Sequence, residues 1–262
     1  MRIYDHATAD IVRYMETHRR DTLEQYEPAF ENYLRLIRQG RSVDGSTRML
    51  EIGTGTGWFP ILCRTRGLQC RGLEISPPLI AFAQDFGRRY GVAPDIALGN
   101  LEESSLGREQ YDVIVASSVF EHVEHWRRGL EKIYDALAPG GALFFESTNK
   151  FSFTSGEYGF PLYGWLPNAW RYRLRIALQG PDIMRLGIDF HQFTYFGLRR
   201  VFRQLGFAVV KDRVDLASLD RLHGIKRLLV SAARRFPPLR HLLLLFAETT
   251  TFVCVKRDKR VR

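Results

Sequence analysis

The chain has little that would place it outside a reducing compartment or within a membrane. It holds only three cysteines in 262 residues, Cys63, Cys70 and Cys254, and none stands in a Cys-x-x-Cys pair. Scattered cysteines argue against a disulfide framework and against a zinc site. The longest apolar run, residues 242–247, is far shorter than the roughly 20 residues that span a bilayer. Residues 1–20 are polar and charged, so we expect no secretory leader and a cytoplasmic protein.

Acidic residues are scarce in the second half of the chain. Residues 1–149 hold 17 Lys and Arg against 21 Asp and Glu, a net charge of −4. Residues 150–262 hold 21 against 8, a net charge of +13, and the two parts give the chain's +9. Three interpretations of the basic half remain open: contact with an anionic membrane surface or lipid-like substrate, contact with a nucleic acid, or a solvated basic face without a partner.

The most informative feature that is present is a glycine-rich segment after a short apolar run. Residues 48–52, Arg-Met-Leu-Glu-Ile, are typical of a buried parallel strand, and Gly53, Gly55 and Gly57 then lead into an apolar segment that can begin a helix. Glycine permits positive φ and a close approach of the backbone to a ligand, and the free N–H groups of a helix start favour an anionic group. The segment therefore predicts a cradle for a charged small molecule.

Two fingerprints compete for the identity of that ligand. The dinucleotide pattern Gly-x-Gly-x-x-Gly requires Gly or Ala three residues after Gly55, where this chain has Trp58. The chain instead reads Glu-x-Gly-x-Gly-x-Gly from Glu51. This pattern resembles motif I of the class I S-adenosylmethionine (SAM) dependent methyltransferases of the type 11/12/23-like family. A NAD-dependent oxidoreductase and an ordinary glycine-rich turn remain the alternatives.

Later segments continue the resemblance. Glu74 ends a second apolar stretch, 21 residues after Gly53, and is placed to accept both ribose hydroxyls of a nucleoside. Asn100 stands where the family usually has an acid that receives the adenine amine, so adenine recognition and turn formation are both open for it. Residues 112–145 resemble the family's stretch from the fourth strand to the Pro-Gly-Gly turn. The resemblance implies SAM as cofactor, S-adenosylhomocysteine as product, and a cofactor site formed by Glu51, Gly53, Thr54, Gly55, Gly57, Glu74, Ile75, Asn100, Leu101 and Ser117.

Alternation of strand-like and helix-like segments predicts an α/β fold with helices on both faces of a mostly parallel sheet. The resemblance implies a Rossmann-like sheet of seven strands with an antiparallel seventh strand. We expect one globular domain in three parts. Residues 1–45 are predicted to be an N-terminal cap of two helices around Pro28, residues 46–149 the SAM-binding half, and residues 150–262 the substrate-side half.

Two inserts characterise the substrate side. Residues 150–190 are rich in aromatic residues among glycines and prolines, and we expect them to line a pocket for an apolar small acceptor or to pack as core and lid. Residues 215–247 combine apolar residues at helical spacing with arginines, which predicts a basic amphipathic helix over 221–240 and a peripheral membrane contact. Residues 117–120 are not the Asn/Asp-Pro-Pro-aromatic motif of base-amine methylation and no Cys nucleophile is near, which argues against a nucleic-acid acceptor.

Two histidines are candidates for catalysis. His191 directly precedes a helix, where related enzymes often have a histidine facing the acceptor, and a histidine titrates in the range that suits a general base. A structural role as a helix cap is the alternative for His191, and Asp189 could orient it. His122, after the fourth strand, is the weaker candidate, with packing as its alternative. The end of that strand, residues 116–118, lacks the acid cluster of metal-assisted O-methyltransferases, so we expect no metal.

The sequence identifies neither the acceptor nor the oligomeric state, and it leaves methylation at nitrogen or carbon open. A SAM-binding module without catalysis is an alternative of a different class, and a methyltransferase of a lipid-like or membrane-associated acceptor is a close variant. The function that the sequence favours is a metal-independent SAM-dependent methyltransferase acting on a small molecule at oxygen.

Overall fold

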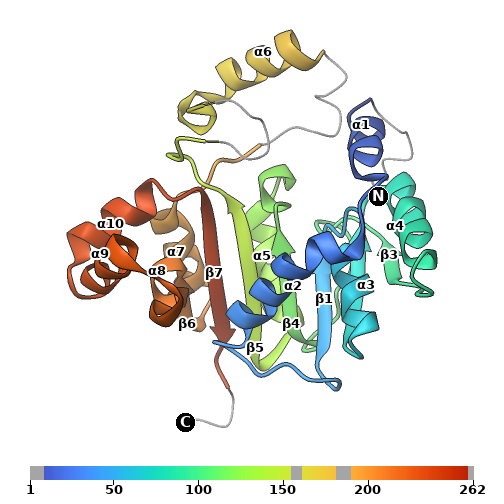
Figure 1. Cartoon of the computed structure of the whole chain (residues 1–262), viewed down its shortest axis with the longest axis horizontal. Helices are drawn as coiled ribbons and strands as arrows, with labels where there is room; N and C mark the ends of the chain where they lie inside the picture. The colour runs from blue at the N-terminus through green and yellow to red at the C-terminus, as the bar shows by residue number, and fades with distance from the viewer. Residues whose placement is uncertain (1–8, 155–160, 181–189, 259–262) are drawn as a thin grey trace.

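A seven-stranded sheet forms the centre of the computed structural model, which describes residues 9–154, 161–180 and 190–258 (Figure 1). The strand order is β3-β2-β1-β4-β5-β7-β6, and only β7 runs antiparallel to its neighbours. The predicted α/β class and the antiparallel seventh strand are therefore confirmed. The strands are β1 (Arg48–Ile52), β2 (Gln69–Glu74), β3 (Asp95–Leu98), β4 (Tyr111–Ser117), β5 (Leu137–Thr148), β6 (Phe207–Asp212) and β7 (Thr249–Lys256).

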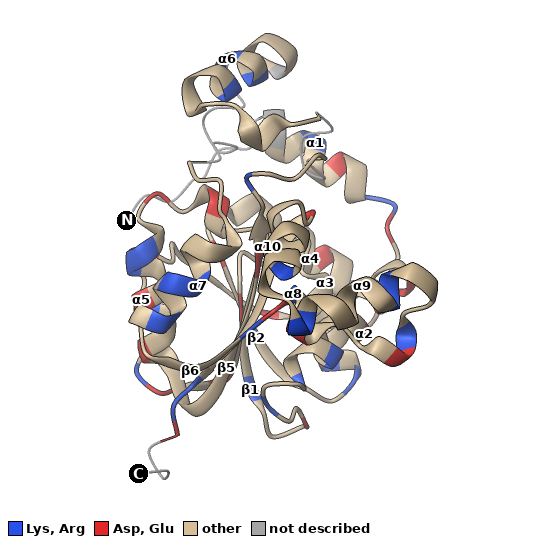
Figure 2. Cartoon of the chain, turned by 90° about the vertical axis from the view of Figure 1, so that its left-hand side faces the viewer, with Lys and Arg blue, Asp and Glu red and all other residues tan. Residues whose placement is uncertain are grey.

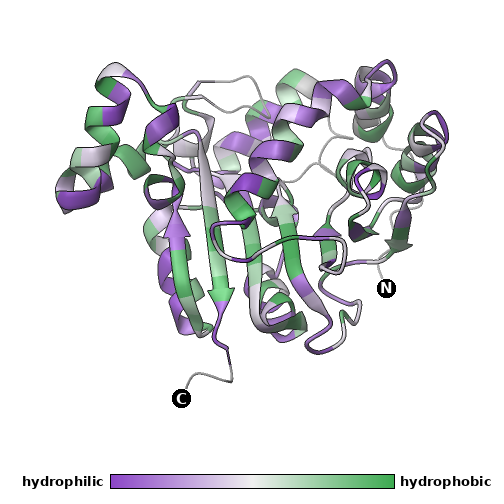
Figure 3. Ribbon diagram, turned by 60° about the horizontal axis from the view of Figure 1, so that its bottom comes forward, coloured by the Kyte–Doolittle hydropathy of each residue, from purple (hydrophilic) through white to green (hydrophobic). Residues whose placement is uncertain are grey.

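Helices cover both faces of the sheet. Side chains alternate along a strand, so Met49 of β1 joins a core with α2 and α3, while Leu50 joins a core with α5 and α7 on the other face. Figure 3 shows the apolar character of the central strands that both cores require. The helices are α1 (Ala9–His18), α2 (Leu23–Ile37), α3 (Trp58–Thr65), α4 (Pro77–Arg88), α5 (Trp126–Ala136), α6 (Asn168–Gln179), α7 (Tyr195–Gln204), α8 (Arg213–Leu216), α9 (Gly224–Arg235) and α10 (Pro237–Leu245).

The N-terminal cap contains two helices, but they do not divide at Pro28. The break lies at residues 19–22, and Pro28 is inside α2. The N–H of Thr22 donates to Oε1 of Gln25 at 3.0 Å, which helps to start α2 at this point. Pro28 lies within the first two turns, where its missing N–H removes one helical hydrogen bond without ending the helix.

The basic insert is also divided differently from the prediction. The single helix expected over 221–240 is two helices, α9 and α10, which meet at Phe236. Pro237 and Pro238 lack N–H groups and fit the first turn of a new helix, so they end α9 and start α10. No helix in the described part of the chain is long and apolar enough to cross a membrane.

Candidate functional site

The glycine-rich turn lies at the carboxyl edge of the sheet, between β1 and α3. Gly53, Gly55 and Gly57 have φ angles of 68°, 55° and 78°, in the left-handed region that favours glycine. A Cβ on Gly53 would lie 2.6 Å from Cγ2 of Val119, and a Cβ on Gly57 would lie 2.6 Å from Cβ of Ala83. Both torsion and space therefore require glycine here, and the backbone of the turn is open to a ligand.

Trp58 occupies the position where the dinucleotide pattern needs a small residue. Its indole stacks on the ring of Tyr26 in α2, with ring centroids 5.3 Å apart and an interplanar angle of 5°. The indole therefore packs against α2 and leaves α3 free to pack closely on the sheet. The turn accommodates a bulky residue that a dinucleotide-binding turn would exclude.

Glu51, at the end of β1, is a buried carboxylate with one oxygen that lacks a hydrogen-bond partner in the described part of the chain. Its side chain is only 6% exposed, and its Oε2 has no hydrogen-bond partner among the described residues. Burial raises the pKa of Glu51 well above its ordinary value, and the nearby Cys70 and Glu74 add to the effect. Buried polar atoms are normally paired, so an oxygen left in this state is suited to a cationic ligand group.

Glu74, at the end of β2, is held by backbone donors around the same turn. Its Oε2 accepts from the N–H of Gly55 at 2.9 Å, and its Oε1 accepts from the N–H groups of Ile75 and Ser76 at 2.9 and 3.0 Å. Burial raises the pKa of Glu74, although these three hydrogen bonds oppose the shift. Three of the roughly four acceptor positions of the carboxylate are therefore in use, and the remaining one, on Oε2, is available to a ribose hydroxyl.

A cavity of about 120 Å³, which we call the cofactor-side cavity, lies beside Gly53 and is lined by Leu73 and Ile75, the neighbours of Glu74. Its lining includes apolar side chains on both sides of a narrow space, together with Asn100. Oδ1 of Asn100 accepts from the N–H of Glu102 at 2.9 Å, so its turn-forming role is present. The lining residues include Gly53, Ile75, Asn100, Leu101, His122 and Phe190.

Two other predicted cofactor residues turn away from this cavity. Oγ1 of Thr54 lies 3.5 Å from the carbonyl oxygen of Leu73, beneath the turn. Oγ of Ser117 lies 2.7 Å from Oη of Tyr33 in α2. Neither residue is among those that line the cavity, and of the other predicted cofactor residues Glu51, Gly55, Gly57 and Glu74 are not in its lining either.

Tyr14 of α1 is a site residue that the sequence reasoning missed. A Cβ on Gly55 would lie 3.1 Å from the Tyr14 hydroxyl, so this hydroxyl sits directly over the glycine turn. Burial of the hydroxyl end, with the charges of Glu74 and Glu51, raises the pKa of Tyr14 to about 12. The hydroxyl therefore stays protonated and can donate a hydrogen bond. The apolar pattern of α1 predicted a covering helix but gave no signal for this contact.

A second cavity, of about 300 Å³, lies at the carboxyl ends of β4 and β5 and the start of β7. Glu121 is the most buried acid in its lining, at 1% exposure, and its Oε2 accepts from Oγ of Ser147 at 2.6 Å. The lining residues all carry polar side chains except Gly164: Ser118, Glu121, Ser147, Thr148, Asn149, Ser152, Thr154, Gly164, Gln192, Glu248 and Thr249. We call this space the acceptor cavity.

Of the two roles expected for the aromatic residues of the insert, packing is the one seen for Phe153 and Trp165. None of its described aromatic residues lines the acceptor cavity. Phe153 and Trp165 instead pack near Phe246 at the end of α10, with centroid separations of 4.9 Å and 6.2 Å from it. Nε1 of Trp165 donates to the carbonyl of Ser152 at 3.0 Å, which fixes the ring outside the cavity. Tyr158 and Phe160 lie outside the described residues.

The two predicted catalytic histidines occupy different places. Nε2 of His191 lies 2.9 Å from the carbonyl oxygen of Glu124, and the ring packs edge-on against Trp126. Its neighbours Phe190 and Gln192 line the cofactor-side cavity and the acceptor cavity respectively, so this segment separates the two spaces. His122 lines the cofactor-side cavity itself. Asp189, expected to orient His191, lies outside the described residues.

These features together fit SAM. The described residues around the turn supply an unpaired buried oxygen on Glu51, a remaining acceptor position on Glu74, and apolar surface at Ile75, Leu101 and Phe190. Within residues 9–154, 161–180 and 190–258 no three His, Cys, Asp or Glu side chains are grouped so that they could hold a metal ion.

Comparison with known proteins points the same way. A family model described as a methyltransferase domain matches residues 15–212. Over 113 residues the chain is 28% identical to the malonyl-[acyl-carrier protein] O-methyltransferase of Serratia marcescens, and over 125 residues it is 27% identical to a ubiquinone biosynthesis O-methyltransferase of Methylobacterium sp.. These matches cover 43% and 45% of this chain, and 42% and 49% of the relatives, so the chain spans less than half of each relative's length.

A solved structure gives the same fold at lower identity. A SAM-dependent methyltransferase from Archaeoglobus fulgidus aligns with a TM-score of 0.57 and 18% identity, covering 94% of this chain and 99% of that one. At this identity the likeness establishes the shared fold.

Proposed function

The chain belongs to the class I SAM-dependent methyltransferases, and we propose that it methylates a hydroxyl oxygen of a small polar molecule bound in the acceptor cavity. SAM supplies a methyl group already activated by its sulfonium. The protein's contribution is to hold the acceptor oxygen in line with that methyl, to exclude water and to receive the proton. The polar side chains in the wall of the acceptor cavity, which residues 190–192 separate from the cofactor-side cavity, are the observation that carries this proposal.

On the cofactor side, we assign charge recognition to Glu51 and ribose recognition to Glu74. The glycine turn lets the backbone approach the ligand, and Tyr14 donates a hydrogen bond from above. Asn100 contacts adenine while it keeps its turn hydrogen bond to Glu102, since an amide oxygen can accept two hydrogen bonds.

On the acceptor side, we assign binding of the hydroxyl to Glu121 and Ser147. Their 2.6 Å hydrogen bond places a carboxylate and a hydroxyl together in the wall of the cavity. A carboxylate there can accept a hydrogen bond from an acceptor hydroxyl and orient its oxygen. Two curated relatives are named O-methyltransferases, which supports oxygen as the site of transfer.

His191 and His122 remain candidate bases. His122 faces the cofactor-side cavity, whereas the contact between His191 and the Glu124 carbonyl favours a role for His191 in holding residues 190–192 between the two cavities. If His191 holds this segment, its replacement by Asn weakens acceptor binding and leaves the pH profile of kcat unchanged. If His191 is the base, the same replacement removes the acid-side limb of that profile, because a base acts only in its deprotonated form.

The test is turnover with methyl-labelled SAM and pools of hydroxylated metabolites, with S-adenosylhomocysteine and methyl ethers or esters as readouts. We expect Glu121→Gln to lower turnover and keep the affinity for SAM. Glu131→Gln, an exposed acid on α5, is the matched control and should leave both unchanged. SAM binding without turnover in any pool would indicate a binding module instead. Tighter binding of NAD than of SAM would contradict the cofactor assignment.

A further inference from the structure

Helices α9 and α10 lie at one edge of the molecule (Figure 1), and several of their large apolar side chains are exposed to solvent. Ile225 and Leu228 on α9 are 72% and 71% exposed, and Phe236 and Leu242 are 58% and 53% exposed. Single exposed apolar residues are common, but several on one helical hairpin mark an interaction surface. We call this surface the α9–α10 face; it comprises Ile225, Lys226, Arg227, Leu228, Arg235, Phe236 and Leu242.

The hairpin is firmly attached to the body of the protein. Ala233 and Leu244 are its buried contacts with the core, at 1% and 3% exposure. The side-chain amide of Asn149, at the end of β5, donates to the carbonyls of Leu244, Leu245 and Ala247 and so holds the end of α10. The exposed apolar side chains therefore belong to a fixed surface.

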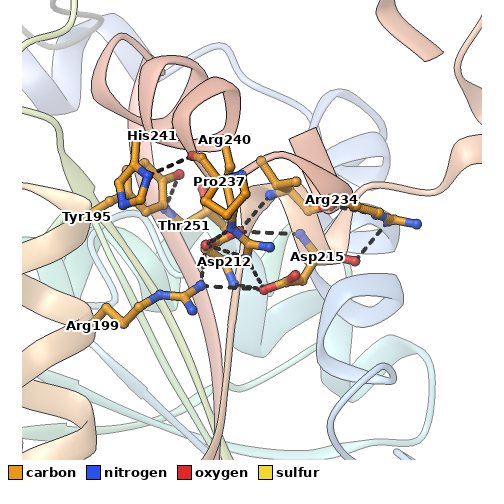
Figure 4. Close-up of polar contacts among 10 residues, drawn as sticks. Tyr195, Arg199, Asp212, Asp215, Arg234, Pro237, Arg240, His241 and Thr251 are labelled. Carbon is orange, nitrogen blue, oxygen red and sulfur yellow. Dashed lines mark hydrogen bonds and ion pairs between the residues drawn. The ribbon is translucent and has the colours of Figure 1, made fainter. Parts of the chain in front are cut away.

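Two arginines of the insert are used for this attachment (Figure 4). Arg240 forms ion pairs with the fully buried Asp212 and with Asp215, and Arg199 of α7 contacts the same two acids. Arg234 donates to backbone carbonyls at the end of α8, including that of Val214 at 3.1 Å. The guanidinium groups of Arg234 and Arg240 are thus engaged by the body of the protein.

Three other cations of the insert indicate what kind of partner this surface suits. Lys226 and Arg227 lie between Ile225 and Leu228 in the sequence, Arg235 ends α9, and all three are exposed. Figure 2 shows basic residues along this helix. Residues 221–247 contain no Asp or Glu. A helix that combines apolar side chains with Lys and Arg and lacks acids suits the interface of a bilayer that carries anionic lipids.

We propose that the α9–α10 face docks on an anionic lipid surface. A second copy of the chain is a poorer occupant, because a symmetric contact would bring Lys226, Arg227 and Arg235 against their own copies. Nucleic acid is also a poorer occupant, because phosphates would leave Ile225 and Leu228 without an apolar partner. A bilayer interface satisfies both kinds of side chain at once.

Docking in this way places the acceptor cavity near the lipid surface. Phe246, directly after α10, stacks on Phe153, which is 53% exposed, and Ser152 next to Phe153 lines the acceptor cavity. The apolar surface therefore continues from the hairpin to the rim of the cavity. This position of the cavity would make a membrane-associated acceptor accessible to the enzyme, an inference that rests on the proposed function. The docking of the α9–α10 face on lipid does not depend on the proposed function.

The experiment is sedimentation of the full chain with vesicles of phosphatidylcholine alone and of phosphatidylcholine mixed with phosphatidylglycerol. We expect binding only to the mixed vesicles and a loss of binding at high salt. The triple variant Lys226→Gln, Arg227→Gln, Arg235→Gln should bind roughly a hundredfold more weakly, at roughly fivefold for each charge. The apolar variant Ile225→Ser, Leu228→Ser keeps every charge and should also bind more weakly.

The matched control removes three exposed arginines from α3, the loop before β4 and α5: Arg64→Gln, Arg108→Gln and Arg128→Gln. It makes the same change in net charge and should retain binding, and SAM affinity should be unchanged in all variants. An equal loss in the control, or full binding by the triple variant, would overturn the proposal. So would self-association or duplex DNA binding through the same residues without vesicle binding. Vesicle binding without methyl transfer would contradict the proposed function alone.

Discussion

Glu74 allows the cofactor assignment to be tested most directly. The replacement Glu74→Gln keeps the volume of the side chain but exchanges one carboxylate oxygen for an amide nitrogen. In the protein both oxygens accept hydrogen bonds from backbone N–H groups, those of Gly55, Ile75 and Ser76. Whichever way the amide is turned, its NH₂ group faces at least one N–H donor, so a hydrogen bond to the turn and an acceptor for the ribose are lost together.

The expected effect on binding is larger than the effect on stability. Loss of a charge-assisted acceptor weakens SAM binding by about 1–3 kcal/mol, or roughly 5- to 150-fold in Kd. The donor left unmatched costs about 1–3 kcal/mol of stability, but the neutral amide also removes the burial cost that raises the pKa of Glu74. We therefore expect a net loss of about 1 kcal/mol and a fall in Tm of about 2–4 °C.

Calorimetric titration with SAM, together with a thermal melt, measures both quantities. Glu131→Gln on the exposed side of α5 is the control and should change neither. Because the carboxylate pKa is raised, wild-type affinity is present above that pKa and falls as the pH falls through it, at a higher pH than for an ordinary glutamate. Part of this acid-side loss should disappear in the Gln variant. Wild-type affinity in Glu74→Gln would refute the ribose assignment.

Three further predictions concern the turn and the attachment of the hairpin. Burial raises the pKa of Glu51 well above its usual range, so binding of an ammonium group should favour the charged form of Glu51 and release a proton. Calorimetry in buffers of different ionisation enthalpy measures this proton release. A binding heat that does not depend on the buffer would contradict it. In Gly53→Ala the new Cβ would lie 2.6 Å from Val119 at a φ of 68°. The replacement should lower the free energy of unfolding by about 1–3 kcal/mol and weaken SAM binding. Adding Val119→Ala should recover part of the lost Tm but not all of it. Arg240→Gln should lower the free energy of unfolding by about 1–3 kcal/mol, because it leaves the buried Asp212 with fewer charged partners; denaturant unfolding measures this, and an unchanged midpoint would show that the remaining ion pairs suffice.

Local patterns were sufficient for the elements around the cofactor. Buried strands appear as short apolar runs, and Gly53 and Gly57 mark a left-handed turn because no other residue fits both the torsion and the space. The break of the N-terminal cap was misplaced because Pro28 is a strong local signal, whereas the contact between Thr22 and Gln25 that starts α2 is a weak one. The prediction failed where two local signals competed.

The sequence by itself determined the fold class, the glycine turn and its two flanking acids, because these depend on residues close together in the chain. Only the tertiary structure decided the chemistry of the acceptor cavity, since Glu121, Ser147 and Gln192 come from separate segments and meet only when the sheet is assembled. It also decided which cations of the basic insert are available to a partner. Arg240 turns inward to Asp212 while Lys226 faces solvent, and the direction of a side chain depends on the packing of its helix against the rest of the molecule.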